Sequence, residues 1–324
     1  MKLPPPSSAK RRLLLLTLAS ISLLAIAPWI GPPPGKGNPD WIFWKLRLPR
    51  ALAAALAGAG LSAAGMGFQA LFRNPLATPF TLGVASGASL GAALYYKFGI
   101  AFSLLFLSGT TIAALAGALL SVLIVYKIAN LQKSFGTQTL LLAGVAISLF
   151  FSSLILFAQF LSSFTSSVQI LHWLMGGLDV LGYKPVLTLA VFVLPFLALL
   201  LLRGRELDLM TTGEDLAQSR GVNVARAKKL LFFVNSAMVG GIVSIAGPIG
   251  FVGLIGPHLA RLLISPSHRF LAPASMLLGA SLLIACDTLA RTLIAPAELP
   301  VGILTALLGG PFFLWLLVGR KGFH

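Results

Sequence analysis

The sequence predicts an all-α membrane protein with about ten transmembrane helices and both termini in the cytoplasm. Of its 324 residues, 57% are hydrophobic and only 10% are charged, whereas an ordinary soluble domain carries about 25% charged residues. Several apolar runs reach the roughly 20 residues that a transmembrane helix needs. The basic residues gather in the short connections between these runs. These observations exclude an ordinary soluble protein and indicate a multi-pass membrane protein.

Ten apolar segments follow one another along the chain. An even number of crossings places both termini on the same side of the membrane. The eighth segment is short and interrupted by glycines. The segments are Leu13–Ile30, Leu48–Phe72, Phe80–Tyr96, Ala101–Val125, Leu140–Leu161, Pro185–Leu202, Leu230–Ala246, Ile249–Ile264, Phe270–Ala290 and Pro300–Val318.

The first segment follows a basic run at 10–12, a pattern that also begins a signal peptide. No cleavage site with small residues follows it, because Pro28 and Trp29 stand there instead. We therefore interpret the segment as an uncleaved first helix. The predicted organisation is a cytoplasmic tail at 1–12, a single ten-helix transmembrane domain at 13–318 and a cytoplasmic tail at 319–324.

The formal net charge of +16 arises from 24 Lys and Arg residues against 8 Asp and Glu residues. A basic patch of this size would indicate nucleic-acid binding. Here, however, most basic residues fall in loops on the side of the N-terminus, which is the bias that keeps positive loops in the cytoplasm. We therefore expect membrane lipid around the chain, and no nucleic-acid partner.

Basic residues on the outer side oppose this bias and need a specific explanation. Arg47 and Arg50 lie at the start of the second segment, where lipid headgroups or an acidic external partner would explain them. Asp287 and Arg291 lie four residues apart near the outer end of the ninth segment. Such a pair can satisfy itself on one helix face, or it can serve a function, because charges at membrane depth are costly.

The longest polar stretch, 203–229, separates the sixth and seventh segments. In it, Thr211 and Thr212 are each followed three residues later by an acid, which is the pattern of a capping box. Gly221 would then end the helix in the left-handed conformation. The stretch therefore predicts a short cytoplasmic helix over 214–220, and a solvated connector without a partner is the alternative.

Glycines recur at fixed spacing within the segments, every four residues at 83, 87 and 91 and every three at 247, 250, 253 and 256. Small residues on one helix face allow the close backbone approach that drives helix packing in lipid. We expect them to pack helices together, rather than to line a ligand site.

The sequence offers little for catalysis. Its four histidines are scattered without metal-ligand spacing, and Cys286 is its single cysteine. The glycine-rich stretch 31–37 departs from the phosphate-loop pattern in spacing and lacks its Ser or Thr. We therefore expect no catalytic residue and no metal site, so that any ATP hydrolysis would come from another chain.

Five stretches of the chain carry recognisable motifs: R-L-P-R (47–50), Q-A-L-F-R-N-P-L-A-T-P (69–79), G-F-V-G-L-I-G-P-H-L-A-R (250–261), D-T-L-A-R (287–291) and E-L-P-V-G-I-L-T-A-L-L-G-G-P-F-F (298–313). In this order and spacing, they resemble the permease family of ABC importers for iron-siderophores, haem and vitamin B12. The resemblance runs from about residue 46 to 317.

The resemblance implies a homodimer around a central pathway in the bacterial inner (cytoplasmic) membrane. Two ATP-binding cassette subunits would lie below it, with ATP and Mg bound to them and no cofactor bound to this chain. A periplasmic or lipid-anchored binding protein would deliver an iron chelate (siderophore or haem) or cobalamin. The alternative is an ion-coupled secondary transporter, which usually carries carboxylates near the membrane midplane; this sequence has almost none.

The resemblance also implies roles for individual residues. Arg47, Arg50 and Arg291 match positions that receive Glu side chains of the binding protein. The segment that couples to the ATPase would comprise Gly213, Glu214, Asp215, Leu216, Ala217, Arg220 and Gly221, with Arg220 standing where the family usually has Leu.

Two constrictions of the pathway are implied in the same way. Asn74 and Leu76, in a turn that Pro75 breaks, resemble residues that narrow its cytoplasmic end. Thr137 and Gln138 match a second constriction, where a small hydroxyl is commoner than Gln138. Backbone exposed by such a turn is tolerated only inside protein or beside a water-filled cavity.

Overall fold

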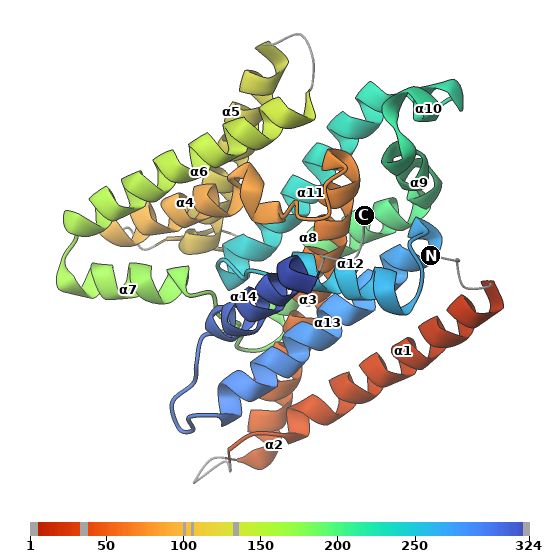
Figure 1. The fold of residues 1–324 in the computed structure, drawn as a ribbon. Coiled ribbons are helices and arrows are strands. Elements are labelled where there is room, and N and C mark those ends of the chain that lie inside the picture. The colour runs from red at the N-terminus through yellow and green to blue at the C-terminus, as the bar shows by residue number, and fades with distance from the viewer. Residues whose placement is uncertain (1–5, 33–37, 100–101, 105–106, 132–135, 320–324) are drawn as a thin grey trace.

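The computed structural model describes residues 6–32, 38–99, 102–104, 107–131 and 136–319. The described chain is almost entirely helical, and each of the ten predicted segments corresponds to a helix (Figure 1). Within these ranges, seven helices are long and apolar enough to cross a membrane, and two further apolar helices are shorter. The ends of the two predicted tails, 1–5 and 320–324, lie outside the described residues.

The predicted segments differ from the observed helices mainly at their ends. The corresponding helices are α1 (Pro6–Ile26), α3 (Leu48–Phe72), α4 (Val84–Phe98), α5 (Gly109–Leu131), α6 (Thr137–Phe160), α8 (Lys184–Leu202), α11 (Val224–Ala246), α12 (Val252–Leu263), α13 (His268–Thr292) and α14 (Val301–Gly319).

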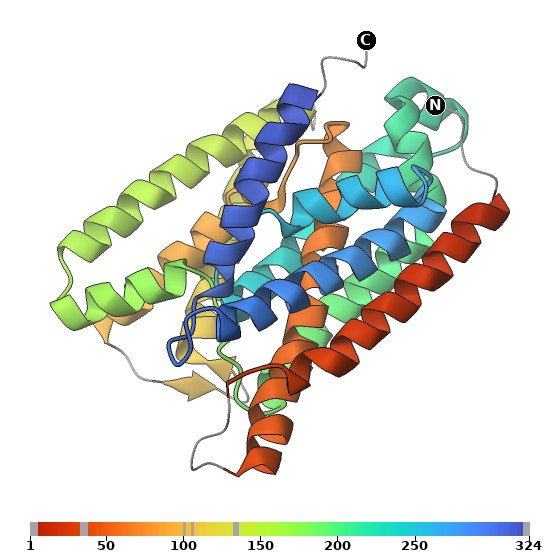
Figure 2. The same ribbon diagram turned by 60° about the horizontal axis from the view of Figure 1, so that its bottom comes forward.

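Helix α3 forms the centre of the body and is buried along most of its length. Helices α8, α11, α12 and α13 pack around it (Figure 2). A Cβ added to Gly58 would lie 2.3 Å from the carbonyl oxygen of Gly279 in α13. One added to Gly65 would lie only 1.9 Å from the carbonyl oxygen of Gly253 in α12. The helices therefore touch backbone to backbone, which only glycine permits at these positions.

Helices α4, α5 and α6 form a second group, on the left in Figure 1. Gly87 and Gly91 of α4 face the backbone of α5 at Gly117 and Ala113, where an added Cβ would lie within 2.4 Å of a carbonyl oxygen. The predicted packing role of the four-residue repeat is thus confirmed. The three-residue repeat is only partly confirmed, because an added Cβ at Gly250 would meet no atom within 4 Å.

Four predicted segments begin earlier in the sequence than the observed helices, and the differences are largest before α4 and α5. Pro79–Leu82 forms a 3-10 turn (η3), and α4 starts only after Gly83, whose φ of 76° turns the chain. Two short strands, β1 (Ser103–Leu104) and β2 (Leu107–Ser108), precede α5. The amide of Gly109 then donates to the carbonyl oxygen of Phe102 at 2.9 Å.

Other elements lie outside the predicted segments. The short helix α2 (Pro39–Ile42) and a π-helical turn at Phe43–Arg47 extend α3 on its N-terminal side. Within the first predicted segment, a 3-10 turn, η1 (Ala27–Trp29), follows α1. Helix α7 (Phe164–Leu174) begins at Ser163, whose hydroxyl accepts a hydrogen bond from the amide of Ser166. Its polar first turn explains why no apolar run revealed it.

The polar stretch contains two helices, α9 (Gly204–Thr212) and α10 (Glu214–Ser219), where one was predicted. Helix α10 confirms the predicted helix, but the predicted capping boxes are wrong. Gly213, with φ 143° and ψ 148°, separates the helices, and the hydroxyls of Thr211 and Thr212 donate backward to carbonyl oxygens of α9. Gly221 has the predicted left-handed conformation, with φ 86°.

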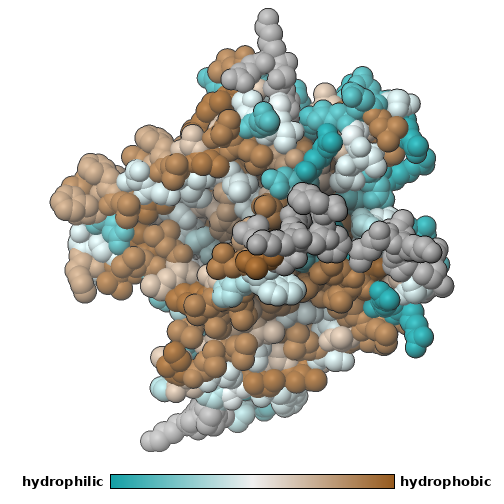
Figure 3. All heavy atoms as spheres, viewed as in Figure 1, coloured by the Kyte–Doolittle hydropathy of each residue, from teal (hydrophilic) through white to brown (hydrophobic). Residues whose placement is uncertain are grey.

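The start of α1 and the end of α14 lie on the same side as α9 and α10 (Figure 2). Hydrophilic residues gather over α9 and α10, whereas apolar residues cover much of the remaining visible surface (Figure 3). Large apolar side chains are exposed along α1, α6 and α14, including Leu18, Phe150 and Leu314. This distribution fits an embedded body with one polar face in the cytoplasm.

Candidate functional site

The three predicted arginines meet at the outer end of the body. Arg47 ends the π-helical turn, Arg50 lies in the first turn of α3, and Arg291 lies in the last turn of α13. Because α3 and α13 pack against each other in opposite directions, the start of one helix lies beside the end of the other. The three arginines line one pocket of about 480 Å³ together with Asp179 and Glu298.

Asp287 lies between two of these arginines, and only 1% of its side chain is exposed. Its Oδ1 accepts a hydrogen bond from Nε of Arg50 at 2.7 Å, and its Oδ2 accepts one from Nε of Arg291 at 3.1 Å. Burying a charge is costly unless the charge is paired and hydrogen-bonded. Asp287 therefore holds the two guanidinium groups together and makes their burial possible.

Arg291 is enclosed by the protein, with 5% of its side chain exposed. Besides pairing with Asp287, it donates to the carbonyl oxygens of Ile30 and Ala27 at 3.2 and 3.4 Å and to Oγ1 of Thr288 at 3.3 Å. Its guanidinium thus joins the chain after α1 to the end of α13. In this arrangement, Arg291 organises the pocket wall.

The other two arginines are closer to the opening of the pocket. Arg50 donates through Nη1 to Oε2 of Glu298, whose side chain is 49% exposed. Arg47 is half-buried and donates through Nη2 to the carbonyl oxygen of Pro32. Of the three guanidinium groups, that of Arg47 is therefore the most accessible.

The structure confirms the ion pair predicted between Asp287 and Arg291 and adds Arg50 as its third member. The places of Glu298 and Asp179 were not foreseen. Asp179 is far from all three arginines in the sequence, and Glu298 follows Arg291 only after α13 has ended, so helix spacing does not bring these two together. The one signal in the sequence for a role of Glu298 was its position at the outer side, as one of only 8 acidic residues in the chain. The docking role of the arginines remains a prediction.

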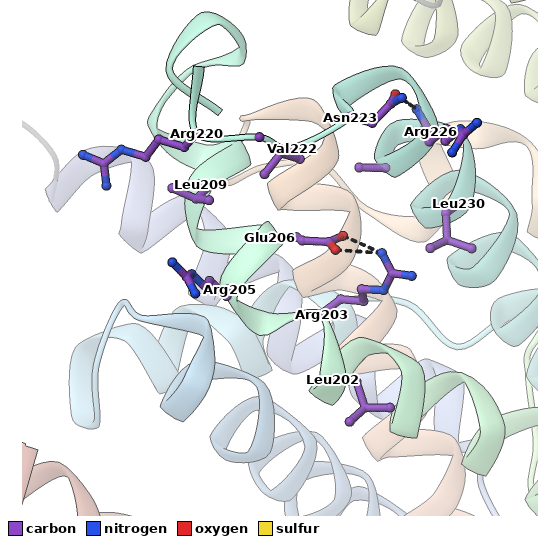
Figure 4. A pocket seen from close by; sticks show the side chains of 12 residues that line it. Leu202, Arg203, Arg205, Glu206, Leu209, Arg220, Val222, Asn223, Arg226 and Leu230 are labelled. Atoms are coloured by element: carbon purple, nitrogen blue, oxygen red, sulfur yellow. Dashed lines mark hydrogen bonds and ion pairs between the residues drawn. The ribbon is translucent and has the colours of Figure 1, made fainter. Parts of the chain in front are cut away.

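At the opposite end, a pocket of about 860 Å³ lies between α9 and the start of α11 (Figure 4). Arg203 donates to both carboxylate oxygens of Glu206 at 2.7 and 2.8 Å. Asn223 caps α11 by accepting a hydrogen bond from the amide of Arg226 at 3.0 Å. Four arginines and a single carboxylate line this pocket, so the cytoplasmic face is strongly basic there.

Helix α10 is attached to α11 by an ion pair. Nζ of Lys228, which is buried, lies 2.7 Å from Oε1 of Glu214. The small side chain of Ala217 is buried, whereas Leu216 is 45% exposed. A pocket of about 770 Å³ beside α10 is lined by Glu214 and Lys228 and also by Thr137 at the start of α6. The structure thus brings α10 close to one of the predicted constriction residues.

Helix α9 is attached to α13 by Asp208. Its Oδ1 accepts hydrogen bonds from the amide and from Nδ1 of His268, both at 2.7 Å, and its Oδ2 accepts one from the hydroxyl of Ser267 at 3.0 Å. Burial alone would raise the pKa of the Asp208 carboxyl, but the hydrogen bonds from His268 and Ser267 outweigh burial and lower it. The carboxylate therefore caps α13 from outside its own helix. The sequence analysis missed this contact.

The predicted constriction residues occupy two separate elements. Asn74 lies in the turn after α3, where its side-chain oxygen accepts a hydrogen bond from the amide of Leu76 at 2.9 Å. Thr137 and Gln138 form the first residues of α6. Among the described residues, no hydrogen bond joins the two elements, so a shared constriction remains a prediction.

Comparison with known proteins identifies the family. The sequence model of the FecCD transport family matches residues 13–319. The chain is 40% identical over 317 residues to the vitamin B12 import system permease protein BtuC of Klebsiella pneumoniae, covering 96% of this chain and 92% of that protein. It is also 40% identical over 284 residues to the hemin transport system permease protein HmuU of Yersinia pestis, covering 87% and 84%.

A solved structure supports the same assignment. That structure shows an inward-facing conformation of a transporter classed as a metal-chelate type ABC transporter. It matches this fold with a TM-score of 0.87 at 33% identity, over 96% of this chain and 99% of that chain. The match therefore extends over the whole helical body and both of its polar ends. Together with the family match, this likeness shows that the chain belongs to the FecCD transport family, the permeases of ABC importers.

Proposed function

We propose that this chain is the translocation subunit of an importer that carries an iron chelate (siderophore or haem) or cobalamin across the bacterial inner membrane. Two copies would enclose the pathway, and two ATP-binding cassette subunits, with ATP and Mg, would supply the energy. The observation that carries the proposal is the separation of two polar regions at opposite ends of one apolar body. The outer region holds Arg47, Arg50 and Arg291, and the cytoplasmic region holds α9 and α10.

The outer pocket suits a reversible acidic partner. Arg–carboxylate pairs form strong hydrogen bonds with defined orientation, and charge complementarity speeds association more than it raises affinity. A binding protein that docks and leaves in each cycle needs these properties. Arg47 and Arg50 are the side chains best placed to meet its carboxylates, and Arg291 holds Arg50 in position through Asp287.

The cytoplasmic region suits a partner that pushes on the membrane helices. Helix α10 exposes Leu216 and is attached to α11 through the pair between Glu214 and Lys228. Helix α9 is attached to α13 through Asp208 and His268. A displacement of either short helix would therefore be passed to a helix that contacts the central α3.

The cargo is proposed from the relatives, whose names specify vitamin B12 and hemin. Uptake into vesicles that contain this permease with its ATPase and binding protein tests the proposal, with a ferric siderophore, haem and cobalamin each offered as labelled substrate. ATP-dependent accumulation of one of them is expected. Accumulation driven by a proton or sodium gradient without ATP would instead support a secondary transporter.

Replacing Arg47 by glutamate together with Arg50 by glutamine is expected to abolish stimulation of the ATPase by the binding protein. One repulsive and one uncharged contact would replace two attractive ones, and like charges at an interface cost several kcal/mol. The measurement is the ATPase rate of the complex in nanodiscs with increasing binding protein.

Arg50 is changed to glutamine and Arg291 is left unchanged, because a glutamate at either position would face Asp287 in a buried site. The matched control is Lys45→Glu, which reverses an exposed outer charge close in sequence. Assembly with the ATPase should be normal in both variants. Stimulation that survives the double substitution would refute the docking role.

Replacing Glu214 by lysine is expected to uncouple ATP hydrolysis from transport, because two positive charges would then meet where α10 contacts α11. A hydrogen bond to a charged group contributes about 1.5–3 kcal/mol, so the substrate moved per ATP should fall several-fold. The exchange variant, Glu214→Lys with Lys228→Glu, should recover much of the loss. If the exchange recovers nothing while the single variant is impaired, the pair has no coupling role.

A further inference from the structure

We propose that Glu298 is an internal substitute for the carboxylate of the docking partner. The Glu298 side chain occupies Arg50 until the partner's carboxylate displaces it. This inference rests on the proposed docking function and adds a means of regulating it. Arg50 donates to two carboxylates of its own chain, Asp287 through Nε and Glu298 through Nη1. The two carboxylates differ in burial, in the element that carries them and in what their removal would leave behind.

Burial makes only one of the two carboxylates exchangeable. Asp287 is 1% exposed and bridges two guanidinium groups, so its departure would leave buried arginines without a counter-charge. Glu298 is half-exposed at the edge of the pocket and contacts Arg50 alone among the described basic residues. If an incoming carboxylate takes its place, Arg50 keeps the same charge balance and the same number of hydrogen bonds.

Glu298 also lies on a segment that a change at Arg50 would affect. It belongs to the non-helical linker between α13 and α14, in which residues 293–298 are exposed. The linker is held to α13 through the amide of Leu299, which donates to the carbonyl oxygen of Ala290 at 3.1 Å. Just beyond it, the amide of Gly302 donates to the carbonyl oxygen of Gly176 at 3.0 Å.

Among the ion pairs of the described residues, this one connects α3 to the linker that leads into α14. Helix α14 packs mainly on α13 and has a largely exposed outer face, so it depends on few contacts for its position. When a docked carboxylate takes Arg50, Glu298 is released and the linker loses its attachment to α3. Docking on the outside would in this way be signalled to α14, which begins three residues after Glu298.

The first test measures binding of the binding protein to the permease–ATPase complex in nanodiscs. Glu298→Gln should raise its affinity about fivefold or more, a gain of the order of 1 kcal/mol in binding free energy, because the competing carboxylate is gone. The matched control is Asp179→Asn, which removes a carboxylate from the same pocket that forms no ion pair with the described residues. An equal gain in both variants would overturn the proposal, because Glu298 would then act only through its charge.

The second test needs no partner. The only native cysteine, Cys286, is buried, so a nitroxide on Ala297→Cys can report the motion of the linker. Glu298→Gln should increase the mobility of the nitroxide in the free permease. Docking of the binding protein should increase it in the same way in the chain that keeps Glu298. Unchanged mobility would overturn the proposal.

The two possible failures can be told apart. If Arg47→Glu with Arg50→Gln leaves binding intact, the docking function itself is wrong and the proposal falls with it. If these arginine substitutions abolish binding but Glu298→Gln changes neither affinity nor mobility, docking holds and only the substitute role of Glu298 is refuted.

Discussion

Replacing Asp287 by alanine is expected to remove most of the folded permease from the membrane. Arg50 and Arg291 would then lie together in a buried site without the carboxylate that pairs with both. Breaking a buried ion pair from one side costs about 3–5 kcal/mol, and here the loss leaves two like charges next to each other. Marginal stabilities of about 5–15 kcal/mol cannot absorb this loss without a large rise in unfolded protein.

The measurement is the amount of monodisperse protein after detergent extraction, together with its thermal midpoint. Asp287→Asn should be intermediate, because an amide oxygen still accepts one hydrogen bond but carries no charge. Glu298→Gln is the matched control, since its carboxylate meets the same Arg50 but is half-exposed. A normal yield and a normal thermal midpoint for Asp287→Ala would contradict this prediction, because they would show that Arg50 and Arg291 are solvated by water or neutralised by another group.

Replacing Gly65 by alanine is expected to be nearly as damaging, although it adds a single methyl group. The new Cβ would lie 1.9 Å from the carbonyl oxygen of Gly253 and 2.7 Å from its Cα. Both obstructing atoms belong to the backbone of α12, so no side chain can rotate away and the two helices must separate. Overpacking of this kind costs about 1–3 kcal/mol of stability and occasionally more. For Gly65→Ala we expect a loss of stability at the upper end of this range.

The thermal midpoint of the purified permease measures this effect. Gly250→Ala adds the same methyl group three residues before Gly253, at a position where an added Cβ would meet no atom within 4 Å, and it should leave the midpoint unchanged. Equal midpoints for the two variants would mean that α3 and α12 are less tightly packed than described here.

The spans could be predicted from the sequence because crossing a bilayer demands a long apolar run, and such runs are visible without knowledge of neighbours. Helix α7 does not need to cross the membrane, and its start, with Ser163, Thr165 and Ser166, resembles a loop. The strands before α5, each made of one serine and one leucine, were included in the next predicted span. Local amino-acid composition therefore does not reveal α7 as a helix, and it does not separate the strands before α5 from the helix that follows them.

The candidate site shows the same division between local and distant information. The pair of Asp287 and Arg291 could be predicted, because four residues on a helix bring side chains together. The pairing of Arg50 with Asp287 spans 237 residues, and only the packing of α3 on α13 creates it. Likewise, helix α10 was predicted for a wrong reason, because the turn that starts it depends on the backbone of Gly213 and on no threonine cap.

The contacts of α3 at Gly58 and Gly65 also bear on how the protein behaves outside its bilayer. Backbone contact between helices is held by van der Waals packing, and it does not depend on the surrounding lipid being apolar. Extraction into detergent should therefore leave α3, α12 and α13 together, whatever the length of the detergent chain. Helix α1 instead exposes many leucines, such as Leu14, Leu15 and Leu18, to the lipid or detergent around it. A detergent screen for this protein thus selects for the detergent that best covers α1, while the central helices stay assembled in every detergent.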